Sequence, residues 1–178
     1  MKVLESKRLQ LNLVQEKDLE YLLNLRCDIN VCAGIIHSPL SMETQNHWFS
    51  SLGEKYAFII FLKETNEYLG TVGFNNIDRT HQRATWYIRL NSSAQGKGYG
   101  NEASKILVDY AFRHMNINRL DCDCFTNNLA AAANIKKLGF EQEGILKQYY
   151  YHEGKFKDIT LFSLLKENYT GTFKSITL

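Results

Sequence analysis

The sequence has little proline, no linker-like composition and no long apolar run. A single proline among 178 residues, with no stretch rich in glycine, serine or proline, predicts one compact domain over residues 1–178. The longest apolar run, near 57–62, is far shorter than a bilayer span, and the first five residues lack a signal-peptide core. We therefore expect a cytoplasmic protein without a membrane partner.

Strong charge and metal-ligand spacing are also missing. A net charge of +2, with lysine and arginine scattered along the chain, argues against a nucleic-acid partner. The four cysteines form no C-x-x-C pair and have no histidine at ligand spacing, so we expect no metal and interpret them as buried free thiols. Cys122 and Cys124 alternate with Asp121 and Asp123, which places both thiols on one face of a strand.

The hydrophobic pattern that is present changes between period two and period 3.6 along the chain. It predicts an α+β fold of about seven strands and four helices, because the order is not a repeating β-α-β unit. The expected strands are 9–14, 56–62, 68–75, 83–90, 119–125, 141–151 and 156–165, and the expected helices are 16–26, 41–52, 100–115 and 128–138.

A glycine-rich turn joins the predicted strand 83–90 to the helix that begins near Gly100. It reads Gln95-Gly96-Lys97-Gly98-Tyr99-Gly100. Glycines without a Cβ let successive N–H groups approach an anion, and the helix start adds unpaired donors and its dipole. A P-loop would need Ser or Thr after Gly-Lys, and a dinucleotide fingerprint would need G-x-G-x-x-G, so neither fits. An ordinary glycine turn is the alternative.

The turn resembles the Q-x-x-G-x-G/A pyrophosphate loop of the GNAT superfamily of N-acetyltransferases. A second segment, from Asn128 to Lys136-Lys137-Leu138-Gly139-Phe140, is similar to the N-x-x-A…K-L-G-F segment of the same superfamily. The resemblance implies the GNAT fold, with a mixed, mostly antiparallel twisted sheet, and acetyl-CoA as co-substrate. It implies the cofactor-binding residues Tyr87, Ile88, Leu90, Gln95, Gly96, Lys97, Gly98, Tyr99, Gly100, Asn101, Asn128 and Ala133.

Two positions depart from the family pattern. Many relatives carry a glutamate where this chain has Thr85, and a tyrosine where it has Ile135. Neither side chain can transfer a proton, so a base and an acid must come from elsewhere. The sequence offers Tyr149, Tyr150 and Tyr151 as acids and Glu43 and Asp78 as carboxylates, although the tyrosines also suit a packed strand and the carboxylates a solvated surface.

These features predict an enzyme that transfers acetyl from acetyl-CoA to a small-molecule or peptide primary amine by direct attack in a ternary complex. The cysteines have no histidine partner that would favour an acyl-enzyme. A non-catalytic acyl-CoA-binding or regulatory module is the alternative, and a homodimer stays open. Residues 30–41 contain no Asp or Glu, which favours an amino sugar or a protein N-terminal amine over spermidine as acceptor.

Overall fold

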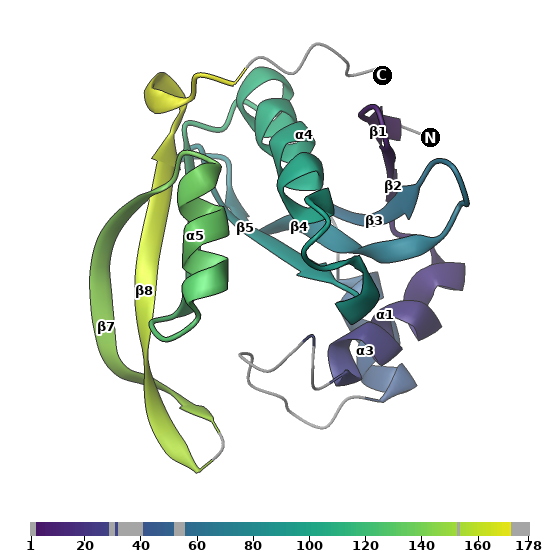
Figure 1. The fold of residues 1–178 in the computed structure, drawn as a ribbon, viewed down its shortest axis with the longest axis horizontal. Coiled ribbons are helices and arrows are strands. Elements are labelled where there is room, and N and C mark those ends of the chain that lie inside the picture. Colours follow the sequence, from purple (N-terminus) through teal and green to yellow (C-terminus); the bar gives the residue numbers. More distant parts are fainter. Residues whose placement is uncertain (1–2, 29–30, 32–40, 52–55, 153, 172–178) are drawn as a thin grey trace.

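The molecule is built on one eight-stranded sheet (Figure 1). The computed structural model describes residues 3–28, 31, 41–51, 56–152 and 154–171. Along the sheet the order is β1-β2-β3-β4-β5-β6-β8-β7. The strands are β1 (Val3–Glu5), β2 (Leu9–Leu13), β3 (Ala57–Leu62), β4 (Tyr68–Asp78), β5 (Arg83–Leu90), β6 (Arg119–Phe125), β7 (Glu141–His152) and β8 (Lys155–Leu165).

Four α-helices and three short 3-10 turns occur in the described ranges. The helices are α1 (Leu19–Cys27), α3 (Met42–Ser50), α4 (Tyr99–His114) and α5 (Leu129–Lys137), and the turns are Glu16–Asp18, Ser92–Ala94 and Lys166–Asn168. None of these helices is long and apolar enough to cross a membrane. Ser41 caps α3 by accepting a hydrogen bond from Thr44 N at 3.2 Å.

The sequence predicted the mixed α+β class and most of the elements. It missed β1, because three residues are too few to display a period. The first helix begins at Leu19 instead of residue 16, since the Asp18 carboxylate accepts from Gln15 N at 2.9 Å and closes a separate turn. Strand β4 continues to Asp78, past the expected end at residue 75. The predicted end of the second helix at Leu52 lies outside the described residues.

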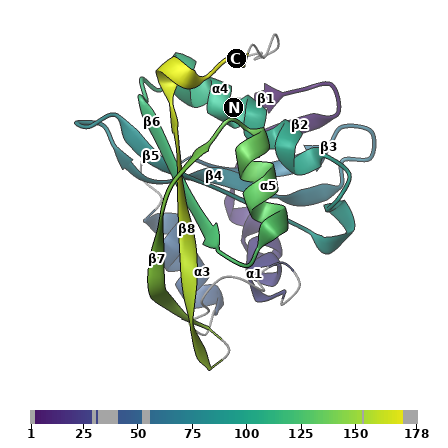
Figure 2. The same cartoon turned by 60° about the vertical axis from the view of Figure 1, so that its left-hand side comes forward.

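Helices cover both faces of the sheet (Figures 1 and 2). On one face, the apolar stripe of α4, including Ile106 and Leu107, packs with Ile135 and Leu138 of α5 in the larger core. On the other face, α1 and α3 pack over a smaller core around Ala57 and Ile59. The sheet is therefore the middle layer of three.

A single parallel pair interrupts an otherwise antiparallel sheet. Strand β5 pairs with β6 only from Arg83 to Thr85, opposite Arg119 to Asp121. The last three strands, β6, β8 and β7, run at a steep angle to β3 and β4 (Figure 2). Two halves of the sheet thus meet over three residue pairs and separate beyond them.

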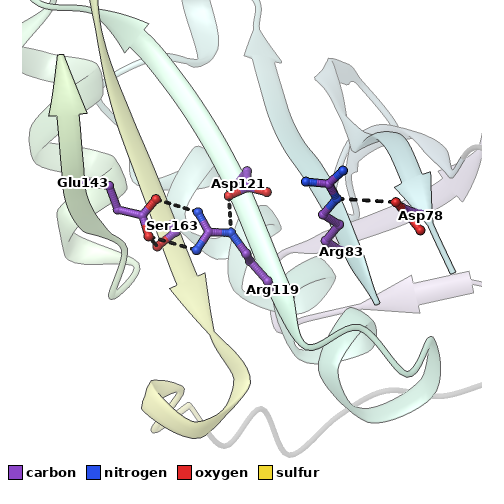
Figure 3. A network of polar contacts seen from close by, with 6 residues as sticks. All are labelled: Asp78, Arg83, Arg119, Asp121, Glu143 and Ser163. Atoms are coloured by element: carbon purple, nitrogen blue, oxygen red, sulfur yellow. Dashed lines mark hydrogen bonds and ion pairs between the residues drawn. The ribbon is translucent and has the colours of Figure 1, made fainter. Parts of the chain in front are cut away.

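An ionic network holds the second half of the sheet together (Figure 3). Arg119 on β6 forms a fork on Glu143 of β7, with Nη1 and Nη2 at 2.9 and 2.6 Å from the two carboxylate oxygens. Its Nε donates to Asp121 at 2.6 Å, and Ser163 of β8 donates to Glu143 at 2.6 Å. Hydrogen bonds from Arg119 and then from Ser163 lower the pKa of Glu143 to about 2.

Replacing Glu143 with glutamine should lower the free energy of unfolding at neutral pH by about 1 kcal/mol or less, because the pair is largely solvent-screened. A carboxyl group whose pKa falls from 4.5 to about 2 on folding stabilises the protein above about pH 4.5 and loses that effect as the pH falls towards 2. Urea unfolding at about pH 7 and about pH 2 measures the difference. Glu141→Gln, also exposed on β7, is the control. An equal loss at both pH values would contradict the assignment.

Candidate functional site

A cleft opens where β5 and β6 separate. Beyond Thr85, β5 continues to pair with β4 up to Leu90, and its pairing with β6 stops. The edge of residues 86–90 that faces β6 therefore has no strand partner in the described part of the chain. Unpaired backbone groups at such an edge can pair with an extended, peptide-like ligand.

The cavity at this point has a volume of about 570 Å³, within the range of about 300–1,000 Å³ that is usual for ligand sites. Its walls come from β4, β5, β6, α5 and the β7–β8 hairpin. The lining residues are Val31, Asn75, Asn76, Thr85, Trp86, Tyr87, Ile88, Arg89, Cys122, Asp123, Cys124, Phe125, Asn128, Ala131, Asn134, Ile135, Tyr150 and Ile159.

The glycine loop lies between the end of β5 and the start of α4. Gly96 and Gly98 have φ of 73° and 79°, a left-handed conformation that favours glycine. The first intrahelical bond runs from Glu102 N to Gly98 O at 3.1 Å, so the N–H groups of residues 99–101 have no intrahelical acceptor. The loop therefore presents donors at the positive end of a 16-residue helix.

Packing sets the loop against the cleft. Gln95 Nε2 donates to Leu90 O at 3.3 Å and closes the turn. A Cβ added to Gly100 would lie 3.1 Å from Leu90 Cδ1 and 3.9 Å from the amide of Asn134, a residue that lines the cleft. Lys97 is exposed on the outer side of the loop. The predicted pyrophosphate residues 95–101 thus adjoin the cavity through Gly100.

Arg8, which lies between β1 and β2, contacts this loop and the first turn of α4. Its guanidinium lies 4.6 Å from the Tyr99 ring centroid and 2.6 Å from a Glu102 carboxylate oxygen, and Nη1 donates to Lys97 O at 3.3 Å. Burial opposes ionisation of Glu102, yet hydrogen bonds from Ser6 and Arg8 keep its pKa below the usual value. Sequence reasoning assigned no role to Arg8, because its partners lie about ninety residues away.

Helix α5 forms the cleft wall opposite β5. Asn128 caps the helix, because its side-chain oxygen accepts a hydrogen bond from Ala131 N at 3.0 Å. The side-chain NH₂ group is not used by the cap and can donate to a ligand in the cleft. The helical period puts Ala131 and Asn134 on the cleft side with Asn128. Ala133, which the family resemblance implied, lies on the exposed side instead.

The three consecutive tyrosines of β7 are not equivalent. Tyr150 lines the cleft, whereas Tyr149 and Tyr151 are 53% and 58% exposed. Burial, and then the nearby Asp123 carboxylate, raises the pKa of Tyr150. Its hydroxyl therefore stays protonated at neutral pH. The position that the family usually fills with tyrosine is occupied by Ile135, which is buried in the cleft wall.

Neither carboxylate predicted from the sequence enters the cleft. Glu43 is exposed on the first turn of α3. Asp78 accepts from the backbone N–H of His81 and contacts the His81 ring, each at 2.9 Å, and lies 3.5 Å from Arg83. These contacts, the backbone bond first, lower its pKa to about 2, which makes it a poor base. Asp78 lies beyond a bulge in β4 and lines a separate cavity that shares Asn76 and Thr85 with the cleft.

The carboxylate that does line the cleft is Asp123 on β6. Thr85 and Asp121 are paired across the two strands, so by alternation Tyr87, Arg89 and Asp123 share the sheet face of α1 and α3. Desolvation by the cleft walls raises the pKa of Asp123 above its usual value, although the residue as a whole is exposed. The sequence pattern could have predicted this position of Asp123. The alternation that places Cys122 and Cys124 on one face of the strand also places Asp123 on the opposite face.

The thiols differ from one another. Cys122 is buried and Cys124 half-buried in the cleft wall, both are free, and burial raises the pKa of each. The prediction of a buried free thiol is thus correct for Cys122. It is wrong for Cys27, which is exposed near the end of α1. Cys32 lies outside the described residues.

A smaller cavity, which we call the acceptor-side pocket, adjoins the cleft on the α1 and α3 face. It has a volume of about 160 Å³ and shares Asn75, Tyr87 and Arg89 with the cleft. Its other lining residues are Leu22, Arg26, Gln45, Trp48 and Thr71. A Cβ at position 73 would lie only 2.6 Å from the Tyr87 hydroxyl. The absence of a side chain at Gly73 therefore leaves room for the Tyr87 ring between the two cavities.

Comparison with known proteins agrees with this architecture. The family model of the acetyltransferase (GNAT) domain matches residues 8–141. The uncharacterized N-acetyltransferase p20 of Bacillus licheniformis is 32% identical over 178 residues, which cover 96% of this chain and 100% of that protein. The [ribosomal protein uS5]-alanine N-acetyltransferase of Escherichia coli (strain K12) is 28% identical over 123 residues, 68% of this chain and 63% of that protein.

A solved structure extends the likeness of the fold over nearly the whole chain. The spermidine N-acetyltransferase from Vibrio cholerae, in complex with CoA and spermine, superposes with a TM-score of 0.87 at 20% identity, covering 93% of this chain and 100% of that one. The two relatives show the likeness in sequence, and this structure shows the likeness in fold. The chain belongs to the GNAT family and is an N-acetyltransferase.

Proposed function

We propose that the chain uses acetyl-CoA to acetylate a primary amine, with both substrates bound together and the amine attacking directly. The observation that carries this proposal is the junction of an unpaired β5 edge with an anion-binding helix start, both opening on one cavity. An extended, amide-containing arm that ends in a pyrophosphate matches this pair of features.

The residues present fit such a molecule. The N–H groups of residues 96–101 would hold the pyrophosphate, with Arg8 fixing the loop behind them. Backbone groups of residues 87–90 would pair with the peptide-like arm. On the other wall, the Asn128 NH₂ group and the Asn134 amide supply side-chain donors and acceptors.

The amine must lose a proton to attack, because its pKa is about 10 in water. We assign this proton to the carboxylate of Asp123, which faces the acceptor side of the cleft. The nitrogen then forms its bond to the acetyl carbon as the carbon–sulfur bond breaks, and the nitrogen loses a second proton, which restores the proton that the Tyr150 hydroxyl gives to sulfur. We assign protonation of the leaving sulfur to the Tyr150 hydroxyl, which keeps its proton because of its raised pKa.

The acceptor remains part of the proposal. An amino sugar or a protein N-terminal amine suits the site better than spermidine, because the described residues that line the acceptor-side pocket include Arg26 and Arg89 and no carboxylate. A polycation would meet like charge there. One relative is named for alanine of a ribosomal protein and the solved structure for spermidine, so the ranking rests on the charge of the pocket.

The proposed function is tested by measuring release of CoA from acetyl-CoA across a panel of primary amines. The panel holds an N-terminal alanyl peptide, a nucleotide-linked 4-amino sugar and spermidine. We expect amine-dependent release, with the highest kcat/KM on one of the first two. Tight binding of acetyl-CoA without turnover of any amine would favour the non-catalytic acyl-CoA-binding module instead.

A further inference from the structure

Two buried donors in the acceptor-side pocket have no acceptor among the residues that the structure describes. Gln45 on α3 is 0% exposed. Its Oε1 accepts a hydrogen bond from Arg26 Nη1 at 2.7 Å. Because arginine can only donate, the atom that contacts Arg26 must be the amide oxygen, and the NH₂ group points away from Arg26. Gln45 Nε2 and Arg89 Nε are both buried without a hydrogen-bond partner in the described part of the structure. Buried donors are rarely left unpaired, so a ligand group, an ion or an ordered water is expected to accept from them.

The charged side chains among the described residues of the pocket are all positive. Its charged lining residues are Arg26 from α1 and Arg89 from β5. Arg26 lies 5.9 Å from the Trp48 ring centroid, and Arg89 lies 5.3 Å from that of Tyr87, so aromatic rings hold both guanidinium groups. The sequence of residues 29–40, between α1 and α3, adds no carboxylate. Asp121 and Asp123 lie on the same sheet face, and neither is among the described residues that line the pocket.

Unpaired donors beside fixed positive charge select an anion. We propose that the acceptor is an amine that also carries an anionic group, a carboxylate or a phosphate, and that Gln45 and Arg89 bind this group. The volume of about 160 Å³ suits such a small group. Because Tyr87 and Arg89 border both cavities, an amine attached to the bound anion would reach the cleft. This inference rests on the proposed function.

The test compares amines that differ only in the anion. One pair is alanyl-glutamate and alanyl-glutamine, both with an amidated C-terminus. The second pair is a nucleotide-linked 4-amino sugar and the same sugar without its phosphates, and spermidine is added as the polycation. Because charge-assisted hydrogen bonds are strong, we expect kcat/KM to be about tenfold or more higher for the anionic member of at least one pair. The pair that responds identifies carboxylate or phosphate as the source.

Three variants locate the effect. Arg89→Gln and Gln45→Leu should each reduce the preference within the responding pair towards one. Arg83→Gln removes the same charge from the same face of β5 outside the pocket, and should keep the preference. Circular dichroism checks that each variant is folded. Should Arg89→Gln fail to fold, the wild-type comparison of the pairs still decides.

The outcomes separate the two proposals. Equal kcat/KM within both pairs, a higher value for spermidine, or a preference that survives in folded Arg89→Gln and Gln45→Leu would overturn the anionic acceptor and leave the acetyltransferase activity standing. No CoA release with any amine, while acetyl-CoA still binds, would overturn the proposed function itself.

Discussion

Replacing Asp123 with asparagine should lower kcat by about a hundredfold or more, the usual contribution of a positioned general base. The change keeps the size of the side chain and removes its capacity to take a proton. Asp123 lines the cleft on the acceptor face of β6, away from the glycine loop. Affinity for acetyl-CoA, measured by calorimetric titration, should therefore stay at the wild-type value.

The pH dependence gives a second readout. Burial raises the pKa of Asp123, and a base works only when deprotonated, so kcat/KM should rise as the pH increases through that raised pKa. The raised pKa also means that folding disfavours the charged form, so Asp123→Asn should keep or increase Tm. Asp121→Asn, on the same strand face, is the control that keeps kcat. A wild-type kcat in Asp123→Asn would rule out the assignment.

The proposed acid is tested in the same assay by three Tyr→Phe variants. Tyr150→Phe keeps the ring and removes the hydroxyl that faces the cleft, so we expect kcat to fall without loss of acetyl-CoA affinity. Tyr149 and Tyr151 are exposed neighbours, and their phenylalanine variants should retain kcat. If all three variants retain full kcat, protonation by tyrosine is wrong and water is the remaining source.

Replacing Gly98 with valine should weaken acetyl-CoA binding by about tenfold or more, because a left-handed φ costs an ordinary residue on the order of 1–2 kcal/mol. Gly98 has φ of 79° and directly precedes α4, so relief of the strain would turn the N–H groups of residues 96–101 out of position. Gly100→Val should act similarly, through the contact with Leu90 Cδ1 at 3.1 Å. Calorimetric titration of the folded variants measures the loss.

A matched glycine controls for backbone strain alone. Gly154, in the turn between β7 and β8, has φ of 75° and open space around its Cβ position. Gly154→Val therefore carries the same conformational cost away from the loop, and should leave acetyl-CoA affinity intact. Lys97→Ala should also have little effect, because this exposed charge is screened by solvent. Unchanged affinity in Gly98→Val would refute the pyrophosphate assignment.

The sequence by itself determined the class of the fold, the order of its longer elements and the family. Strands β5 and β6 have the predicted bounds, and the glycine loop follows β5 as expected. Each of these features depends on neighbours in the chain: a strand has period two, a helix has period 3.6, and a tight turn before a helix needs glycine. The sequence therefore also placed the loop that we propose for the pyrophosphate.

Only the tertiary structure decided which chemical groups share the cleft. Asp78 lies beyond the bulge in β4 and does not line the cleft, while the separation of β5 from β6 opens the cavity that Asp123 lines. The β7–β8 hairpin brings Tyr150, and not its neighbours, to the same wall. Gln45 of α3 and Arg89 of β5 line one pocket. These juxtapositions depend on register, bulges and helix packing between segments far apart in the chain, which no local period encodes.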